Sequence, residues 1–330
     1  MKYQDEFKNP EIRITDNSLT KQKVRLYKIK HFIFDFGGVL IEKTFVLKNL
    51  FELLEHDLKI KIPKIEETPY LRKLKRRLSS GIFSSEEFLE KVLEKYYYPF
   101  QTENGALPSK KVNLAYYLEL WFNLYTKVTH LSSDMAEIAE RLHKAGYIIS
   151  LMSNTHDIHV KSNELRGFYD MFDHIFLSNE IGLIKPDMEK YKHVLKKLDA
   201  KPKTCVFIDD KIRNLIPARE LGIIVLRFES FEKFKEQLNN LGIQKIKPNL
   251  RREIKKKYEK YKKTKKEYKK AKKEYKKAKK EYLKKKYSKK KSLKKRLEFQ
   301  KRRVEYKEKK KKYKEDKKKK EELIKEIRID

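Results

Sequence analysis

The sequence predicts an α/β protein: a parallel sheet with an inserted α-helical cap, followed by a long basic C-terminal helix. Three observations carry this prediction. Short apolar runs alternate with amphipathic segments after about residue 131, and a block of helical segments separates the first apolar run from the others. The last 80 residues are dominated by charge and contain no Gly or Pro. Alternation of this kind is typical of βαβ units, whose parallel sheet is covered on both faces.

Five apolar segments have the composition of buried strands. The first, HFIFDFGGVL at 31–40, ends in an acid and two glycines, which indicates a strand that opens into a tight turn. The later strands are YIISLMS, HIFLS, TCVFID and IIVLRF, separated by helical segments such as MEKYKHVLKKL and NLIPARELG. We therefore predict an N-terminal extension (1–30), a core domain (31–43 and 131–248), a helical cap (44–130) and a Lys-rich helical or coiled-coil tail (249–330).

The cap segment is predicted to be helical because its apolar residues recur at i, i+3, i+4 and i+7. This spacing is found in VLKNLFELLEHDLKI, SSEEFLEKVLEKYY and NLAYYLELWFNLYTK. Ser84 and the acids that follow it are typical of a helix N-terminus. Trp121 and Tyr96–Tyr98 are interpreted as cap packing, with substrate contact as the alternative.

Composition excludes several classes of protein. A single cysteine, Cys205, excludes a disulfide framework and a multi-Cys zinc site, and is interpreted as core filler. No apolar run is long enough to span a membrane, and the N-terminus lacks the apolar region of a signal peptide. We therefore expect a cytoplasmic protein.

The positive charge is concentrated in the tail. The chain carries a formal charge of +36, and residues 251–330 account for +28 of it, with 42 basic and 14 acidic side chains. Tyrosine recurs every seven residues from Tyr261 to Tyr282, in a position opened by Ile254, and Ala271 and Ala278 lie on the same seam. This pattern predicts one continuous helix of up to ~120 Å, with a seam that is weak for a coiled coil. Two interpretations stay open: a solvated charged helix, or nonspecific binding of nucleic acid or another polyanion.

Polar side chains lie where the predicted strands end. They are Asp35 after the first strand, Ser153 and Asn154 after the second, Asp209 and Asp210 after a later one, and Lys185 in a loop before a helix. Because the carboxyl ends of parallel strands meet at one edge of a sheet, we expect these groups to converge. Carboxylates suit a hard cation such as Mg²⁺, while a lysine and a hydroxyl suit the oxygens of a phosphate. Each feature alone has a plainer interpretation as a turn, a helix cap or a solvated pair of acids.

One further pair of side chains has a spacing that suits a metal. His156 and His159 lie three residues apart, but no third ligand is near them in the sequence. We therefore expect a surface or cap-facing role for both histidines.

Four segments, taken in order, resemble the motifs of the haloacid dehalogenase (HAD) superfamily of hydrolases. They are FIFDFGGVLI, ISLMSNT, GLIKPD and VFIDDKIRN, and the resemblance runs from about His31 to Phe228. It is strongest to the branch of phosphatases similar to α-D-glucose-1-phosphate phosphatase. The resemblance implies a Rossmann-like, HAD-like core. A gap of 118 residues between Asp35 and Ser153, against 32 between Ser153 and Lys185, favours a cap inserted after the first strand.

The resemblance also implies the metal site and the nucleophile. Asp35 would be the nucleophile and a Mg²⁺ ligand. The backbone carbonyl of Gly37 and the carboxylate of Asp210 would be further ligands, with Asp209 assisting through water. Most phosphatases of the superfamily have a general acid–base Asp two residues after the nucleophile, and Gly37 occupies that position here. The glucose-phosphatase-like branch carries the same glycine.

The remaining motif residues are implied to hold the phosphoryl group. Ser153 and the backbone at Asn154 would bind its oxygens, Lys185 would neutralise its charge, and Asn214 would brace the loop after the paired acids. The expected function is a Mg²⁺-dependent phosphatase acting on a small phosphorylated metabolite, such as a sugar phosphate, through an aspartyl-phosphate. The alternatives are a noncatalytic or weakly active HAD-like protein whose tail binds a polyanion, and a phosphatase acting on nucleic-acid ends.

Overall fold

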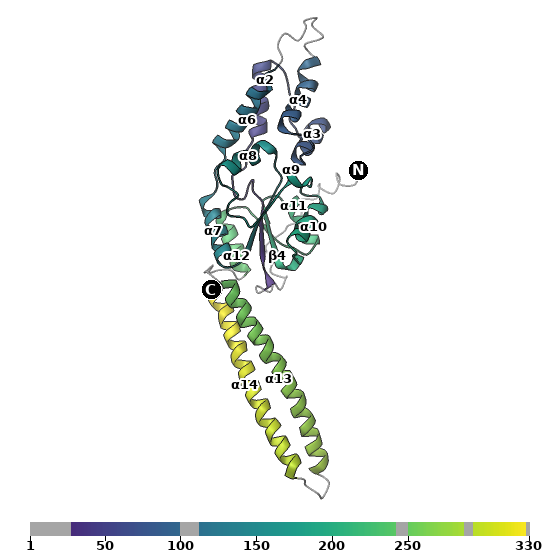
Figure 1. Ribbon diagram of the computed structural model, residues 1–330, viewed down its shortest axis with the longest axis vertical. Helices are drawn as coiled ribbons and strands as arrows, with labels where there is room; N and C mark the ends of the chain where they lie inside the picture. The colour runs from purple at the N-terminus through teal and green to yellow at the C-terminus, as the bar shows by residue number, and fades with distance from the viewer. Residues whose placement is uncertain (1–27, 100–111, 242–249, 287–292, 328–330) are drawn as a thin grey trace. The chain divides into compact units, whose positions relative to one another are not determined.

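One parallel sheet forms the centre of the larger of two compact units. The computed structural model describes residues 28–99, 112–241, 250–286 and 293–327. The strand order is β3-β2-β1-β4-β5 (Figure 1), and every neighbouring pair is parallel. The strands are β1 (His31–Phe34), β2 (Ile148–Ser153), β3 (His174–Leu177), β4 (Cys205–Asp209) and β5 (Ile224–Arg227). The predicted α/β class is confirmed, and the ends of β2, β1 and β4 lie side by side.

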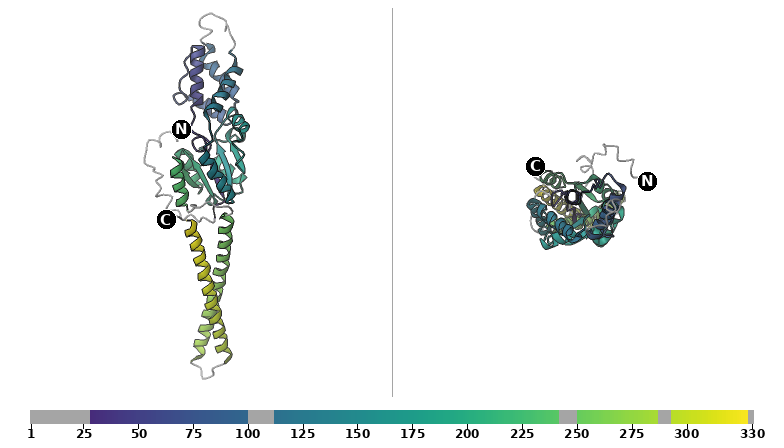
Figure 2. Two further views of the ribbon diagram at one scale, coloured as in Figure 1. Left: turned by 90° about the vertical axis from the view of Figure 1, so that its left-hand side faces the viewer. Right: turned by 90° about the horizontal axis from the view of Figure 1, so that it is seen from above.

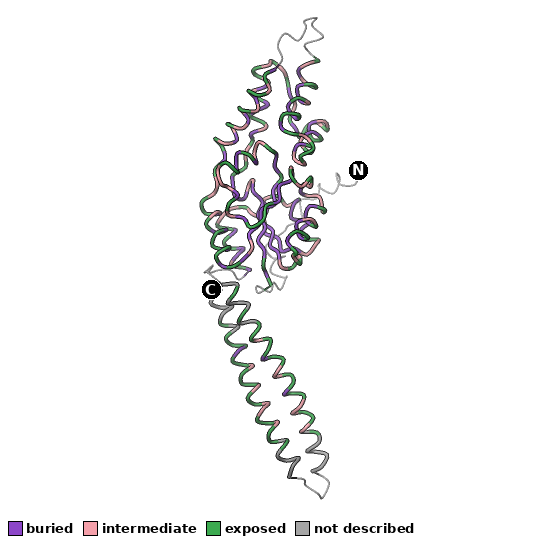
Figure 3. Tube along the Cα trace, in the orientation of Figure 1, coloured by how far each residue is buried: buried purple, intermediate pink, exposed green. Residues whose placement is uncertain are grey.

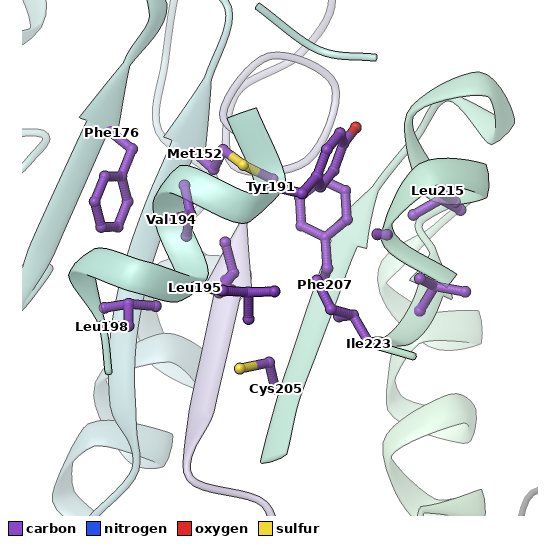
Figure 4. Packing of buried hydrophobic residues seen from close by; sticks show 13 residues of the cluster. Met152, Phe176, Tyr191, Val194, Leu195, Leu198, Cys205, Phe207, Leu215 and Ile223 are labelled. Carbon is purple, nitrogen blue, oxygen red and sulfur yellow. The ribbon is translucent and has the colours of Figure 1, made fainter. Parts of the chain in front are cut away.

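Helices cover both faces of this sheet. On one face α10 (Met188–Lys197) and α11 (Ile212–Glu220) lie over the strands, and α7 (Ser133–Lys144) and α12 (Phe231–Asn240) cover the other (Figure 1). Figure 4 shows the first of these interfaces, in which Tyr191 and Phe207 meet edge to face with ring centroids 5.8 Å apart. Cys205 is fully buried in the same cluster, and burial raises the pKa of its thiol to about 11. The prediction that this cysteine fills the core is confirmed.

Among the described residues, four helices follow β1 before α7. They are α2 (Val46–Leu58), α3 (Pro69–Ser79), α4 (Ser85–Tyr96) and α6 (Leu114–Val128). The predicted N-terminus at Ser84 is confirmed, because its side chain and that of Glu87 form a capping box at the start of α4. Trp121 is fully buried and packs against Phe88 with centroids 6.1 Å apart, as expected of a packing residue. Buried and exposed positions alternate along these helices, as Figure 3 shows.

These helices are tied to the sheet unit by polar contacts. The backbone N–H and the hydroxyl of Ser85 both donate to the carboxylate of Asp157, the first residue of α8 (Asp157–Leu165). Arg76 of α3 donates to Asp187 over 2.5 Å. A side chain at Gly81 would put its Cβ 1.9 Å from the carbonyl oxygen of Asn179, in the short helix α9 (Ser178–Ile181). The sequence pattern did not predict α8 or α9.

The basic tail is helical, but the prediction of one continuous helix is wrong. The chain reverses direction between α13 (Leu250–Lys286) and α14 (Leu293–Ile327), which pack as an antiparallel pair (Figure 2). Tyr261 stacks near Tyr313, with centroids 5.7 Å apart, and Tyr275 near Tyr306, with centroids 5.0 Å apart. Ala271 is buried in the seam between these helices. On a single helix the row of tyrosines would be exposed to water. Because α14 packs against this row, the tyrosines are covered by the second helix.

The two helices belong to a compact unit of their own, separate from the unit that holds the sheet and α2–α6. None of the helices described has the length and apolar content that a membrane span requires.

Candidate active site

Three carboxylates meet at the carboxyl edge of the sheet. Asp35 directly follows β1, where its backbone N–H donates to the carbonyl of Ile208 in β4 over 2.8 Å. Asp209 is the last residue of β4, and Asp210 follows it. Each of the three carboxylates offers an oxygen within 4.8 Å of the others, and among the described residues they form the sole cluster of three or more metal-binding side chains. The convergence expected from the strand order is therefore present.

A buried lysine bridges two of these carboxylates. The ammonium of Lys185 lies 2.7 Å from Oδ1 of Asp35 and 2.7 Å from Oδ2 of Asp209, and its side chain is 1% exposed. The backbone of Lys185 is held by the side chain of Asn154, whose Nδ2 donates to its carbonyl and whose Oδ1 accepts from its N–H, both over 2.8 Å. The sequence placed Asn154 at a phosphate through its backbone, and its side chain has this second task of fixing the lysine loop.

Asp209 is the most heavily bonded of the three acids. Besides Lys185, it accepts from the backbone N–H of Lys211 over 2.8 Å and from Nδ2 of Asn214, which lies 3.0 Å from each carboxylate oxygen. The brace predicted for Asn214 therefore acts on Asp209. All of these donors favour the ionised carboxylate.

The two acids that share Lys185 differ in proton affinity. Burial raises the pKa of Asp35 to about 7, and the charge of Asp209 adds to this rise while Lys185 opposes it. Burial acts in the same direction on Asp209, but the charge and hydrogen bond of Lys185, with the N–H donors above, outweigh it and lower the pKa. Burial also disfavours the ammonium of Lys185, yet the two carboxylates raise its pKa. Asp35 is thus a buried acid whose carboxylate needs more positive charge than Lys185 supplies.

Asp210 has the environment expected of a metal ligand. Its side chain is 4% exposed, and neither of its oxygens accepts a hydrogen bond of ordinary geometry. Two ammonium groups form ion pairs with this carboxylate, Lys43 at 2.8 Å from Oδ2 and Lys211 at 3.8 Å from Oδ1, but these lysine side chains are 61% and 43% exposed. Buried oxygens without hydrogen bonds are costly unless a cation takes them up, and a hard cation such as Mg²⁺ prefers this kind of ligand. The donor set therefore fits a divalent cation.

The loop after Asp35 contains two glycines with different constraints. Gly38 has φ +86°, and a Cβ there would lie 2.9 Å from the Asp210 carboxyl group, so only glycine allows this approach. A Cβ at Gly37 would meet nothing within 4 Å. The site therefore has room for a side chain at the position where the sequence departs from most phosphatases of the superfamily.

The comparisons with known proteins agree with this geometry. A model of haloacid dehalogenase-like hydrolases matches residues 29–222. The chain belongs to this hydrolase family. A sesquiterpene phosphatase of Aspergillus oryzae is 36% identical over 94 residues, which are 28% of this chain and 47% of that protein, so the chain spans about half of its length. A D-ribitol-5-phosphate phosphatase of Bacteroides thetaiotaomicron is 23% identical over 220 residues, covering 64% of this chain and 97% of that protein.

Among solved structures, a HAD family enzyme from Bacteroides thetaiotaomicron shares the fold of this hydrolase. The TM-score is 0.50 at 24% identity, over 63% of this chain and 97% of that one. The predicted HAD-like core is therefore confirmed.

The chain also contains a buried lysine that the sequence did not predict. Lys190 of α10 is fully buried, and its ammonium donates to the Ser153 carbonyl over 2.7 Å and to Oδ1 of Asn154 at 3.2 Å. It fixes the end of β2, where Ser153 is 4% exposed. Burial lowers the pKa of Lys190 well below its ordinary value. The signal was available, because Lys190 lies four residues before Val194 on the apolar face of α10.

His156 is buried and His159 partly buried, and both pack against α6 rather than lying on the surface. Nε1 of Trp121 donates to Nε2 of His159 over 3.3 Å, and the His159 ring stacks on Tyr125 with centroids 3.7 Å apart. The His156 ring lies 3.9 Å from that of His159. The cap-facing alternative is confirmed and the surface alternative is wrong, because the fold sets α8 against an aromatic face of α6.

Proposed function

We propose that this hydrolase removes phosphate from a small phosphorylated metabolite, such as a sugar phosphate, through an aspartyl-phosphate on Asp35. The observation that supports this proposal is the buried Asp35–Lys185–Asp209 bridge at the carboxyl edge of the sheet, beside Asp210. A carboxylate oxygen of Asp35 attacks phosphorus, and the bond from phosphorus to the substrate oxygen breaks, releasing the alcohol. Water then hydrolyses the acyl phosphate, which frees inorganic phosphate and restores the carboxylate.

We further propose that the site holds Mg²⁺ between Asp35, Asp210 and the backbone carbonyl of Gly37, with Asp209 assisting through water. The support is the pair of buried Asp210 oxygens without hydrogen bonds and the raised pKa of Asp35. Bound there, the ion supplies positive charge to the transferring phosphoryl group. The same charge favours Asp35 as a carboxylate at neutral pH.

The phosphoryl oxygens are assigned to Ser153, the backbone at Asn154 and Lys185. Lys185 is pre-positioned for this task because its backbone is fixed by the Asn154 side chain. In this proposal residues 44–130 form the cap, and residues 31–43 and 131–248 form the catalytic core. With glycine at position 37, the proton for the leaving alcohol comes from another group or from water, which favours esters with good leaving groups.

Phosphate release from a panel of esters tests the proposal. The panel contains sugar phosphates, nucleotides and p-nitrophenyl phosphate, each measured with Mg²⁺ and with EDTA. We expect metal-dependent release in the wild type, and a loss of at least a thousandfold in Asp35→Asn, which cannot form the acyl phosphate. The matched control is Asp199→Asn, the same change at an exposed residue with φ +44°, which asparagine tolerates well. Asp35→Asn with the rate of the control would refute the proposal.

A second candidate function is supported by the helical pair α13 and α14: nonspecific binding of nucleic acid. Residues 251–330 carry a net charge of +28. The tyrosines of this pair stack on one another; the rings of Tyr268 and Tyr313 lie 5.0 Å apart and within 3° of parallel. Among the tyrosines whose side chains are described, the stacked faces are unavailable to bases, and we expect binding to rest mainly on contacts between lysines and phosphates.

This second candidate makes a specific prediction about affinity. Because tyrosine faces that stack within the pair cannot also stack on bases, we expect the full chain to bind duplex DNA more tightly than single strands, independently of sequence, and with a steep dependence on salt. Replacing three exposed lysines of α13 with glutamine should reduce the salt slope by about 3; the lysines are Lys266, Lys273 and Lys280. The control replaces three exposed lysines of the sheet unit: Lys161, Lys196 and Lys201. Equal slopes in both triple variants would refute binding through this helix.

A further inference from the structure

A cavity of about 660 Å³ lies between the cap helices and α8. Its wall is formed by α2, by the segment leading to α3, by His156 at the N-cap position of α8 and by His159 within α8. The wall includes Thr44, whose neighbour Lys43 pairs with Asp210, and His156 follows Ser153 by three residues. The cavity therefore begins within a few residues of the carboxylates and of the serine assigned to phosphate.

His156 is a buried polar group without a hydrogen bond. It is 8% exposed, and neither Nδ1 nor Nε2 has a partner. A buried donor or acceptor left unsatisfied is unfavourable, and such groups in folded proteins are usually explained by an ion, a water or a ligand. Because His156 lines the cavity, a ligand inside it can reach this ring.

The ring of His156 is held in place by its neighbours. It lies 5.3 Å from Trp121 and 3.9 Å from His159, between ring centroids. His159 is itself fixed, because its Nε2 accepts from Trp121 and therefore carries no proton, which leaves the proton of the neutral ring on Nδ1. Burial lowers the pKa of His156 to about 4, so its ring is neutral at pH 7.

A neutral imidazole has one donor and one acceptor, which restricts the ligand groups that satisfy it. A hydroxyl group can accept from the N–H or donate to the bare nitrogen, whereas a carboxylate or phosphate only accepts and an ammonium only donates. Among the charged side chains of the wall, Lys48 pairs with Glu52 at 3.5 Å and Lys64 with Glu67 at 3.2 Å, while the charge of Lys75 acts on His156 and lowers the pKa of its ring further. Phe51 and Ile65 add apolar surface, which suits the carbon face of a polyol or sugar.

We propose that His156 determines specificity by hydrogen bonding a hydroxyl group of the leaving alcohol, so that the cavity selects phosphate esters of polyhydroxylated compounds. The assignment of the cavity to the leaving alcohol rests on the proposed phosphatase function. His156 contacts the part of the substrate that does not react, and it is therefore a specificity residue rather than a catalytic one.

Two carbon-matched esters test the proposal through turnover: ribitol phosphate, which carries hydroxyls along its chain, and pentyl phosphate, which carries none. We expect the wild type to prefer ribitol phosphate in kcat/KM, and His156→Leu to lose about tenfold on this ester and less than about twofold on pentyl phosphate. His156→Asn keeps a donor and an acceptor and should recover part of the preference. The control is His174→Leu at an exposed residue. A wild type without preference, or equal losses on both esters, would overturn the proposal.

Trp121 supplies a binding readout that does not need catalysis. It is the single tryptophan of the chain and it touches both histidines, so its fluorescence should respond to a ligand beside His156. We expect ribitol phosphate to change the emission saturably in the wild type and in His174→Leu, and in His156→Leu only at about tenfold higher concentrations. A His156-dependent response without phosphate release would support this proposal while refuting the phosphatase. An identical response in His156→Leu would overturn the proposal whatever the activity.

Discussion

Lys185→Met removes the cation that two buried carboxylates share. Methionine has a similar length and no charge, so the change leaves Asp35 and Asp209 facing each other in a site where the lysine was 1% exposed. Breaking a buried ion pair by removing one partner costs about 3–5 kcal/mol. One carboxyl can take up a proton instead, and Asp35, whose pKa is already about 7, is the group that does so. We therefore expect Lys185→Met to lower the free energy of unfolding by about 3 kcal/mol at pH 7, near the lower end of this range.

Urea unfolding in EDTA measures this loss, with Lys192→Met as the control. Lys192 is an exposed lysine of α10, and its replacement should change the free energy of unfolding by less than about 0.5 kcal/mol. The loss in Lys185→Met should shrink toward pH 5, because a protonated Asp35 no longer needs the ammonium. Mg²⁺ should stabilise this variant more than the wild type. A loss equal to that of the control, or one that does not change with pH, would show that the bridge is not the source of stability.

The remaining predictions concern two glycines at which a Cβ atom would contact a neighbouring group, and the buried His156. Gly38→Ala should displace the Asp210 carboxyl group and lower the free energy of unfolding by about 2 kcal/mol, whereas Gly37→Ala should be neutral in a thermal melt. Gly81→Ala should lower the free energy of unfolding, measured in urea, by about 3 kcal/mol, because its Cβ would meet a backbone oxygen of α9. For His156 the folded-state pKa of about 4 lies below the ordinary 6.5. The neutral ring stabilises the folded state above pH 6.5, and this contribution to the free energy of unfolding, at most about 3 kcal/mol, is lost as the pH falls from 6.5 through 4. His156→Asn should therefore flatten this part of the pH profile of stability.

The parallel sheet and the meeting of its acids follow from local sequence. Each strand is largely an apolar run, and the parallel order brings Asp35, which follows β1, to the same edge as Asp209 and Asp210 at the end of β4. The insertion after β1 follows from the 118 residues between Asp35 and Ser153. These features depend only on the direction of the strands and on the spacing of apolar residues along the chain, and a single sequence is enough to predict them.

Features that depend on which elements pack together were not predicted. The reversal between α13 and α14 lacks a Gly or Pro to mark it, and the tyrosine seam suits a partner helix from any source. The contact from Trp121 to His159 joins residues 38 apart in the chain through the packing of α6 on α8. Lys190 was not predicted, because the buried carbonyl that accepts its hydrogen bond lies in another element, β2.

The central claim is that Asp35 carries the phosphoryl group during turnover. Mixing the enzyme with its best substrate and Mg²⁺, quenching in acid and mapping peptides by mass spectrometry tests this claim directly. We expect a base-labile phosphoryl adduct on the peptide that contains Asp35, present during turnover and absent from Asp35→Asn. Rapid phosphate release without an adduct on this peptide, or with an adduct on a different residue, would contradict the account.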